Sequence, residues 1–306
     1  MGYLFLSVSV LSGSIKGFVA EKISDKTSGI KSAVLTNFIR MLFCIPVGLL
    51  FVLVDGGIGN LAVDKKVLAI AALAGITTSV FIVSWLLAVQ KSAYTAVDTF
   101  LAMGLLVPIL LSFAFYQERI SCSQIIGLVL LLTAVLLMTL YSNQVKTKLT
   151  VFSLLLLLIV GFANGLTDFT QKIFQYNNAE AAPASVFNLY IYVFSAITLL
   201  LVFLCLKEKK PPHAALVDDK QPSAWDKRKT LYIAIMAIFL FCNTYFKTLA
   251  AERLSAVQLY PLAQGSSLVL SLLMSAFFFK EKIKPLCIVG LTVLFAGLLL
   301  INVFTF

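Results

Sequence analysis

The chain has 306 residues, of which 60% are hydrophobic and 12% are charged, and its formal net charge is +10. Soluble globular domains carry about 25% charged residues, so this composition excludes a soluble domain and indicates a membrane protein. The lysines and arginines gather between apolar segments, as membrane topology signals do, and we therefore expect no nucleic-acid partner.

Ten apolar windows are long enough to cross the hydrocarbon core of a bilayer as α-helices. Five lie in the first half of the chain and five in the second. In lipid each backbone amide needs a hydrogen-bond partner within its own segment, so we predict an all-α integral membrane protein. The predicted spans are 3–23, 33–54, 67–90, 93–116 and 121–141, then 151–176, 184–206, 231–251, 254–279 and 284–305.

Residue types that several enzyme classes need are scarce. The five cysteines lie in or beside apolar stretches without a Cys-x-x-Cys pattern, which favours buried hydrophobic positions over disulfides or metal ligands. The sole histidine, His213, lies in a polar loop, so histidine-based catalytic triads and multi-histidine metal sites are excluded. Walker and dinucleotide-binding glycine patterns are missing too. We expect no catalytic residue, no metal and no cofactor.

Two short stretches match each other 163 residues apart. The stretch 115–120, followed by Gly127, corresponds to 278–283, followed by Gly290. In both, an apolar helix stops at an acid–base pair and a new apolar helix starts. The match indicates a duplicated membrane protein.

The number of spans in each repeat determines how the two repeats are oriented in the membrane. We place one five-helix repeat in 1–145 and the other in 146–306, with a polar loop at 207–229 inside the second. Because five is odd, the second repeat must enter the membrane from the side opposite to the first. We therefore predict two inverted repeats, an arrangement that secondary transporters use for alternating access.

The whole chain resembles the drug/metabolite transporter superfamily, specifically its ten-helix EamA-type permeases. This resemblance implies a membrane carrier that exports or exchanges small metabolites, often together with protons. The position of Pro261, earlier in its helix than the matching proline, departs from the pattern. The resemblance is carried by Glu118-Arg119-Ile120 with Gly127, by Glu281-Lys282-Ile283 with Gly290, and by Val107-Pro108.

The junction glutamates Glu118 and Glu281 also have a structural explanation. Each stands where a helix is expected to start, and an acid there complements the positive end of the helix dipole. We expect this role for both residues.

The charge distribution predicts the orientation in the membrane. We number each loop by the span that it follows. Odd-numbered loops carry sixteen lysines and arginines, and even-numbered loops carry four. The positive-inside rule then puts odd loops, including 207–229, in the cytoplasm and both termini outside a plasma (inner) membrane.

Six ionisable residues fall inside the predicted spans. Each costs at least about 2.5–3.5 kcal/mol near the bilayer centre, so these residues should face the bundle interior and find partners. For those near helix ends, Lys16 and Lys172, extension of the side chain to the interface is the alternative. By depth, Lys16, Arg40 and Asp98 lie toward the odd-loop face, and Asp168, Lys172 and Lys247 lie toward the even-loop face. Such clusters suit a pair of gates or the two ends of one polar cavity.

Polar residues at helical spacing predict where a solute binds. Asn164, Asp168, Lys172 and Gln175 form one stripe, and further polar residues mark the seventh, eighth and ninth spans. Helix packing is the alternative for the small hydroxyl residues. We predict substrate contacts from Asn164, Asp168, Asn188, Asn243, Lys247, Tyr260 and Gln264, with the tyrosine available for cation–π contact.

These observations favour a secondary active transporter of a small metabolite. Four intramembrane cations against two acids give +2, which leans toward solutes with a carboxylate or phosphate. Proton coupling would use Asp98 or, preferably, the deeper Asp168, because burial raises and a nearby cation lowers a carboxyl pKa. Lys16, Arg40 and Lys172 would serve in coupling or gating.

Two other functions stay open at this point. An integral-membrane enzyme acting on a lipid-linked substrate would need acids, histidines or cysteines clustered at one interface. A receptor or scaffold would not need charges at mid-membrane depth. For the carrier, the expected partners are a small-molecule substrate, protons and the lipid bilayer, and the expected state is a monomer or homodimer.

Overall fold

The computed structural model describes residues 1–24, 29–91, 97, 100, 101, 103–118, 120–140, 151–177, 182–206, 227–278 and 285–302. These residues form ten α-helices and one short 3-10 helix, η1 (Ile58–Leu61), so the predicted all-α membrane fold is confirmed. The helices are α1 (Gly2–Ser24), α2 (Gly29–Val54), α3 (Lys65–Lys91), α5 (Leu106–Tyr116), α6 (Cys122–Leu140), α7 (Val151–Asn177), α8 (Ala184–Cys205), α9 (Lys227–Arg253), α10 (Ala256–Phe278) and α11 (Pro285–Asn302).

Nine of the ten predicted spans coincide with a helix to within four residues at each end. Among the described residues, six helices are long and apolar enough to cross a membrane, namely α1, α2, α3, α7, α8 and α9. The exception is the span predicted at 93–116: its described residues from Val97 to Gly104 are helical, Leu105 interrupts the helix, and α5 begins at Leu106. Pro108 has no N–H to donate to the carbonyl of Gly104, which explains the interruption at Leu105.

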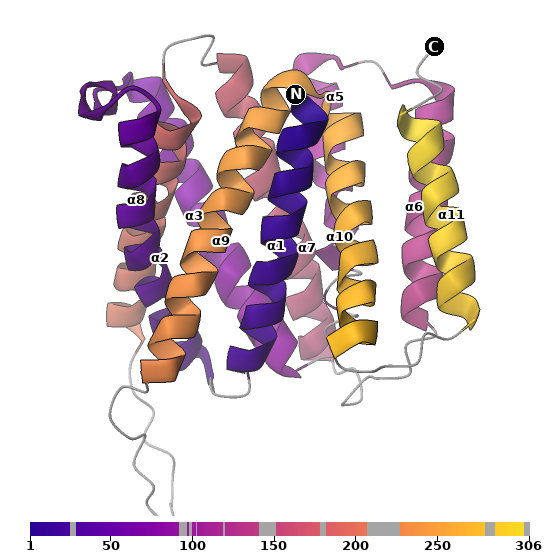
Figure 1. Ribbon diagram of the computed structural model, residues 1–306, viewed down its shortest axis with the longest axis horizontal. Helices are drawn as coiled ribbons and strands as arrows, with labels where there is room; N and C mark the ends of the chain where they lie inside the picture. Colours follow the sequence, from indigo (N-terminus) through magenta and orange to yellow (C-terminus); the bar gives the residue numbers. More distant parts are fainter. Residues whose placement is uncertain are drawn as a thin grey trace, which may run out of the picture.

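The helices stand side by side in one bundle, and the first residue of α1 lies at the same end as the carboxyl end of α11 (Figure 1). The most extensive contacts join α1 to α9, α6 to α11, α3 to α7 and α2 to α8. When helices are matched by their order in the two halves, α1 corresponds to α7, α3 to α9 and α5 to α10. The α1–α9 contact then corresponds to the α3–α7 contact, and α1–α10 corresponds to α5–α7.

Glycines allow the closest of these helix crossings. A Cβ atom on Gly104 would overlap the carbonyl oxygen of Gly161, and one on Gly165 would overlap the carbonyl of Gly104. On α1, a Cβ atom on Gly13 would lie 2.8 Å from Nδ2 of Asn243. Small residues at four-residue spacing bring helix backbones together in this way. These crossings fix α7 and α9 against the first half of the chain.

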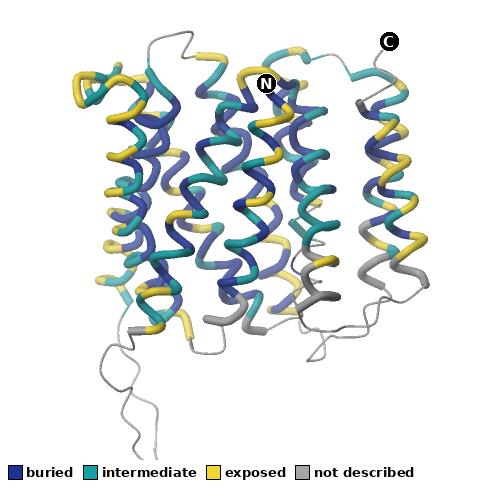
Figure 2. Tube along the Cα trace, in the orientation of Figure 1, coloured by how far each residue is buried: buried dark blue, intermediate teal, exposed yellow. Residues whose placement is uncertain are grey.

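The distribution of polarity is that of a bundle in lipid. Figure 2 shows exposed residues along the outward sides of the helices and buried residues between them. Leu50, Phe115 and Leu204 are 63–71% exposed, whereas Arg40 and Asp168 are 3% and 4% exposed. Lipid solvates the apolar exterior at little cost. The buried charged side chains are costly in free energy unless they find partners.

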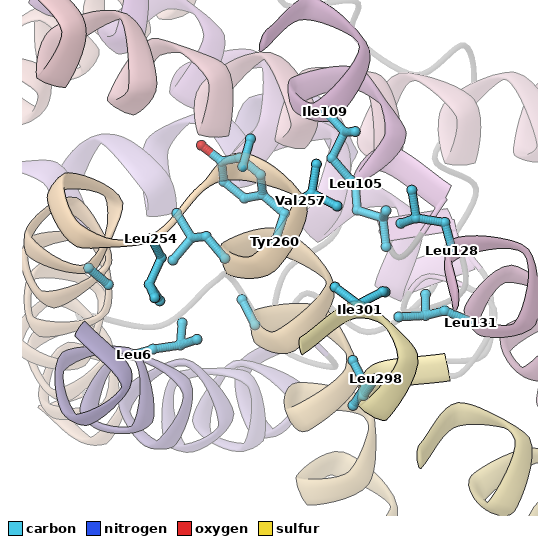
Figure 3. Close-up of a cluster of buried hydrophobic side chains, with 14 of the residues drawn as sticks. Leu6, Leu105, Ile109, Leu128, Leu131, Leu254, Val257, Tyr260, Leu298 and Ile301 are labelled. Atoms are coloured by element: carbon cyan, nitrogen blue, oxygen red, sulfur yellow. The ribbon is translucent and has the colours of Figure 1, made fainter. Parts of the chain in front are cut away.

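A hydrophobic cluster positions α10 next to the polar interior. Leu6, Leu105, Leu131 and Val257 belong to this cluster, which joins α1, α5, α6, α9, α10 and α11. Tyr260 is fully buried in it, and Figure 3 shows its hydroxyl oxygen pointing away from the aliphatic side chains. That hydroxyl donates a hydrogen bond to the backbone carbonyl of Asp168 at 2.7 Å, which connects α10 to α7.

Candidate functional site

A polar cavity of about 120 Å³ lies between the two halves of the chain. Its walls come from α1, α3, α7, α9 and α10. Asn164, in the wall, is thirteen residues from either end of α7, so the cavity lies in the middle of the bundle. Polar and aromatic lining residues are Ser9, Lys16, Thr78, Phe81, Trp85, Asn164, Thr167, Asp168, Gln171, Asn243, Thr244, Lys247, Gln264 and Ser267.

A buried ion pair is the strongest polar contact in this lining. Nζ of Lys247 on α9 donates to Oδ1 of Asp168 on α7 at 2.6 Å, and the two side chains are 12% and 5% exposed. The ammonium also lies 5.5 Å from the ring centroid of Tyr260. A second lysine, Lys16 of α1, is near enough to act electrostatically on the same carboxylate. The pair therefore links α7 and α9, the two helices that cross the first half at glycines.

Four buried polar atoms in the cavity wall have no protein hydrogen-bond partner. They are Oγ1 of Thr78, Nδ2 of Asn164, Oδ2 of Asp168 and Oε1 of Gln171. A buried polar atom without a partner costs about 1–3 kcal/mol. Three of the four belong to α7 within two turns, and they include both donors and acceptors. Such a wall is chemically complementary to a small polar solute.

The end of the bundle where α1 begins is held together by Glu118, in the link between α5 and α6. Its Oε1 accepts a hydrogen bond from the hydroxyl of Tyr176 at 2.7 Å and lies 3.6 Å from Nζ of Lys172. Its Oε2 accepts from the backbone N–H of Ala256 at 2.9 Å. One carboxylate thus connects the first half of the chain to α7 and to the amino end of α10.

Lys172 extends this network to α9. Its side chain is 4% exposed, and its ammonium donates to the carbonyls of Leu254 at 2.6 Å and Ala251 at 3.1 Å. These carbonyls lie at the carboxyl end of α9, where helix carbonyls lack intrahelical partners and attract cations. Glu118 and Lys172 therefore connect the even-loop ends of α7, α9 and α10, and we call them the even-face network.

The comparisons with known proteins agree with this fold. The model of the EamA-like transporter family matches residues 1–140 and 151–303. The chain belongs to the EamA-like transporter family. It is therefore a multi-pass integral membrane transporter of the drug/metabolite type.

A solved structure supports the fold of this EamA-like transporter. The structure, described only as the crystal structure of a protein, superposes with a TM-score of 0.74 at 12% sequence identity. The match covers 99% of the transporter chain and 96% of the other chain. At this identity the likeness concerns the fold alone. No curated protein matches the chain.

Five of the seven residues predicted to contact substrate line the cavity of the EamA-like transporter. These are Asn164, Asp168, Asn243, Lys247 and Gln264. The other two do not belong to its lining. Tyr260 contacts the ion pair instead, with its ring near the Lys247 ammonium and its hydroxyl bonded to the Asp168 carbonyl. Asn188 on α8 donates to the carbonyl of Ala184 and to Oγ1 of Thr248.

Lys172, Glu118 and Arg40 differ from their expected roles or surroundings. Lys172 lies one turn from Asp168 on α7 but pairs with Glu118, and Asp168 pairs with Lys247 across the cavity. We expected Glu118 to start its own helix, but it binds the first N–H of α10. Arg40 is buried on α2 outside the cavity lining, whereas Asp98, Glu281 and most of the loop 207–229 lie outside the described residues.

A capping box explains why α6 does not need Glu118. The hydroxyl of Ser121 accepts from the N–H of Gln124, and the Gln124 side chain accepts from the N–H of Ser121. The pattern Ser-x-x-Gln is visible in the sequence as a helix start. It could have placed the beginning of α6 at Cys122, four residues after Glu118.

Sequence reasoning missed several residues in the EamA-like transporter's cavity wall. Gln171 lies three residues after Asp168 and seven after Asn164, so its helical position was readable. Thr78 and Trp85 on α3 are seven residues apart and share a helix face, but Thr78 lies between Thr77 and Ser79, and this run of hydroxyl residues does not single it out. Gln175, which we assigned to the α7 stripe, donates to the carbonyl of Thr248 and is not part of the lining.

Proposed function

We propose that this transporter is a secondary active carrier that moves a small polar solute by alternating access. The observation that carries the proposal is the mid-bundle cavity, which contains the Asp168–Lys247 pair and four buried polar atoms without protein partners, one of them Oδ2 of Asp168. A cavity of about 150 Å³ holds benzene. The 120 Å³ of this cavity therefore suits a solute of roughly six heavy atoms in this conformation.

The charge of the cavity wall favours an anionic group on the solute. Its ionisable residues are Lys16, Lys247 and Asp168, so two cations minus one acid leave a formal +1. A surplus buried cation favours an anionic partner. Asn164 Nδ2 adds an unpaired donor beside this positive excess. Solutes with a carboxylate or phosphate group are therefore our first candidates.

The packing of the helices supports inverted repeats. Exchange of the two halves converts the α1–α9 contact into α3–α7 and the α1–α10 contact into α5–α7, as a two-fold axis requires. In transporters built this way, the two halves exchange conformations while the solute site stays near the middle. The even-face network, which joins Glu118 to Lys172 and α10, supports a conformation closed on that face.

By the charge count, the closed face is the outer one. In the opposite conformation, the links from Glu118 to Lys172 and Ala256 would have to break. Two ion pairs that involve α7, Glu118–Lys172 and Asp168–Lys247, then have separate roles in the transport cycle. The outer pair controls access, and the central pair meets the solute.

Asp168 is our candidate proton site. A buried carboxylate is costly when charged, and it binds a proton when its cation partner moves away. Movement of α9 relative to α7 would separate Lys247 from Asp168, because each residue belongs to a different helix. A solute that engages Lys247 would have the same effect. Either event would couple solute binding to proton uptake.

Flux measurements in sealed proteoliposomes test this function. A thermal-shift screen of small carboxylates and phosphates first selects a solute, since a ligand that binds the native state raises its stability. We expect Asp168→Asn to abolish accumulation driven by a pH gradient while retaining exchange of labelled for unlabelled solute. Asp64→Asn, at an exposed acid outside the spans, is the matched control and should behave as wild type.

Two results would contradict parts of this proposal. Accumulation at the wild-type rate in Asp168→Asn would remove the proton role and leave the residue as a structural ion pair. Failure of the wild-type protein to move any solute that it binds would remove the carrier function itself.

A further inference from the structure

Arg40 is a buried cation that neither the cavity nor the even-face network uses. It lies in the middle of α2 and is 3% exposed. Its Nε and Nη2 atoms have no hydrogen-bond partner. Neither the Asp168–Lys247 pair nor the Glu118–Lys172 pair includes it. A buried guanidinium without an anion is strongly unfavourable, so its presence requires an explanation.

Among the residues that the structure describes, no carboxylate acts on Arg40. The titratable groups that act on it are Cys44, one turn further along α2, and Tyr192 on α8. Both are neutral at physiological pH in their ordinary state. Lys16, which lines the cavity, also acts on Cys44, so a second cation faces the same space. The packing around them is apolar, with Met41, Ile82 and Leu240 in one buried cluster.

Tyr192, which acts electrostatically on Arg40, also contacts the cavity wall. The hydroxyl of Tyr192 is hydrogen-bonded to Oγ1 of Thr244 and lies 3.4 Å from the carbonyl of Leu240, and both of these residues line the cavity. On the other side, Asn37 of α2 donates to the carbonyl of the lining residue Ile82 at 3.2 Å. The Tyr192–Thr244 hydrogen bond is thus a polar contact between the surroundings of Arg40 and the cavity wall.

We propose that Arg40 is an anion-recognition residue that binds a carboxylate or phosphate group when the Tyr192–Thr244 contact opens. The planar guanidinium fork matches the two oxygens of such a group, which a lysine cannot do. That the anion belongs to the carried solute rests on the proposed function. The anion site itself does not, because a free carboxylate or phosphate ion has the same chemistry.

The thermal stability of purified protein tests this site without a transport assay. Wild type, Arg40→Met, Arg40→Lys and Lys66→Met are compared in sodium acetate, phosphate and chloride. Sodium gluconate at equal ionic strength is the reference, because this anion is too bulky for the space described. Lys66 is an exposed cation at the start of α3, so Lys66→Met controls for the loss of one positive charge.

The expected pattern differs from that of a structural arginine. In gluconate, Arg40→Met should melt at the same temperature as wild type or about 2–4 °C higher, because an uncompensated buried charge is gone. Acetate or phosphate should raise the melting temperature of wild type and Lys66→Met, leave Arg40→Met unchanged, and raise Arg40→Lys less than wild type. An equal rise in chloride would support the anion site but assign it to a free inorganic ion.

Two outcomes overturn the proposal. The first is a lower melting temperature or loss of folded protein in Arg40→Met together with an undiminished anion effect in Arg40→Lys. The second is the absence of any anion effect in wild type. Neither outcome depends on a flux measurement. If the protein transports solute but shows no anion effect, only the proposed role of Arg40 is rejected. If it shows the anion effect but transports nothing, only the carrier function is rejected.

Discussion

Removal of the charge of Glu118 should open the even-loop face of the bundle. Glu118→Gln keeps the shape of the side chain and one acceptor oxygen. It loses the ion pair with Lys172 and the charged acceptor for the N–H of Ala256 or the hydroxyl of Tyr176. A hydrogen bond to a charged group contributes about 1.5–3 kcal/mol. If one such contact is lost only in the closed conformation, the open population rises by about 10- to 150-fold.

Cysteine labelling can measure this change. Ser267 lines the cavity on α10, eleven residues beyond Ala256, and is partly exposed within it. In a background without native cysteines, Ser267→Cys should react with a membrane-impermeant maleimide applied to the even-loop face. We expect Glu118→Gln to accelerate that reaction within the range given, because the labelling rate follows the open population.

A matched control keeps this result specific. Glu252, near the carboxyl end of α9, is an exposed acid on the same face. Glu252→Gln removes the same charge from that face and should leave the labelling rate of Ser267→Cys unchanged. Equal rates in Glu118→Gln and in its parent would refute the reasoning, since the network would then not hold the closed conformation.

Two further predictions concern the cavity. Lys247→Met alone should destabilise the protein by up to about 3–5 kcal/mol, because Asp168 loses the cation that stabilises its charged form and must take up a proton to escape the full cost. Asp168→Asn/Lys247→Met should recover most of the loss, and thermal unfolding in detergent measures both. Single alanine substitutions of the lining residues Asn164, Asn243 and Gln264 should weaken solute binding, measured by calorimetry, with normal expression. Asn188→Ala outside the lining should bind normally, and three wild-type affinities would mean that the solute site lies elsewhere.

The boundaries of the helices were largely predictable because lipid imposes a simple rule. A segment that crosses hydrocarbon must be apolar and helical over its whole length, so hydropathy alone locates it. The start of α5 was not predicted because the rule does not include Pro108, which removes one backbone donor inside an apolar run. Gly161 and Gly165 have the four-residue spacing that is typical of close helix crossings, and both contact Gly104.

The cavity wall was predictable only where residues share one helix face. Asn164 and Asp168 are four residues apart, about 40° around the helix axis, and both reach the cavity. A second step of four brings Lys172 about 80° from Asn164, which turns it away from the lining. The partner of Lys172, Glu118, comes from the first half of the chain. Such a contact depends on how helices cross, which local spacing does not contain.

Glu118 illustrates why a sequence motif can be located correctly and still be misassigned. The repeated Glu-basic-Ile pattern marks a junction between two helices, and the structure has that junction between α5 and α6. An acid near a helix start suggests a dipole or capping role in its own helix. Glu118 does accept a hydrogen bond at the start of a helix, but that helix is α10 and not α6.

Counterflow in sealed proteoliposomes tests most directly whether this protein is an alternating-access carrier. Vesicles are loaded with an excess of unlabelled solute and diluted into a trace of labelled solute, with no pH gradient. A carrier with one central site returns labelled solute inward as it releases unlabelled solute outward, so we predict transient accumulation above the outside concentration. A simple approach to equal concentrations, with no overshoot, would contradict the account.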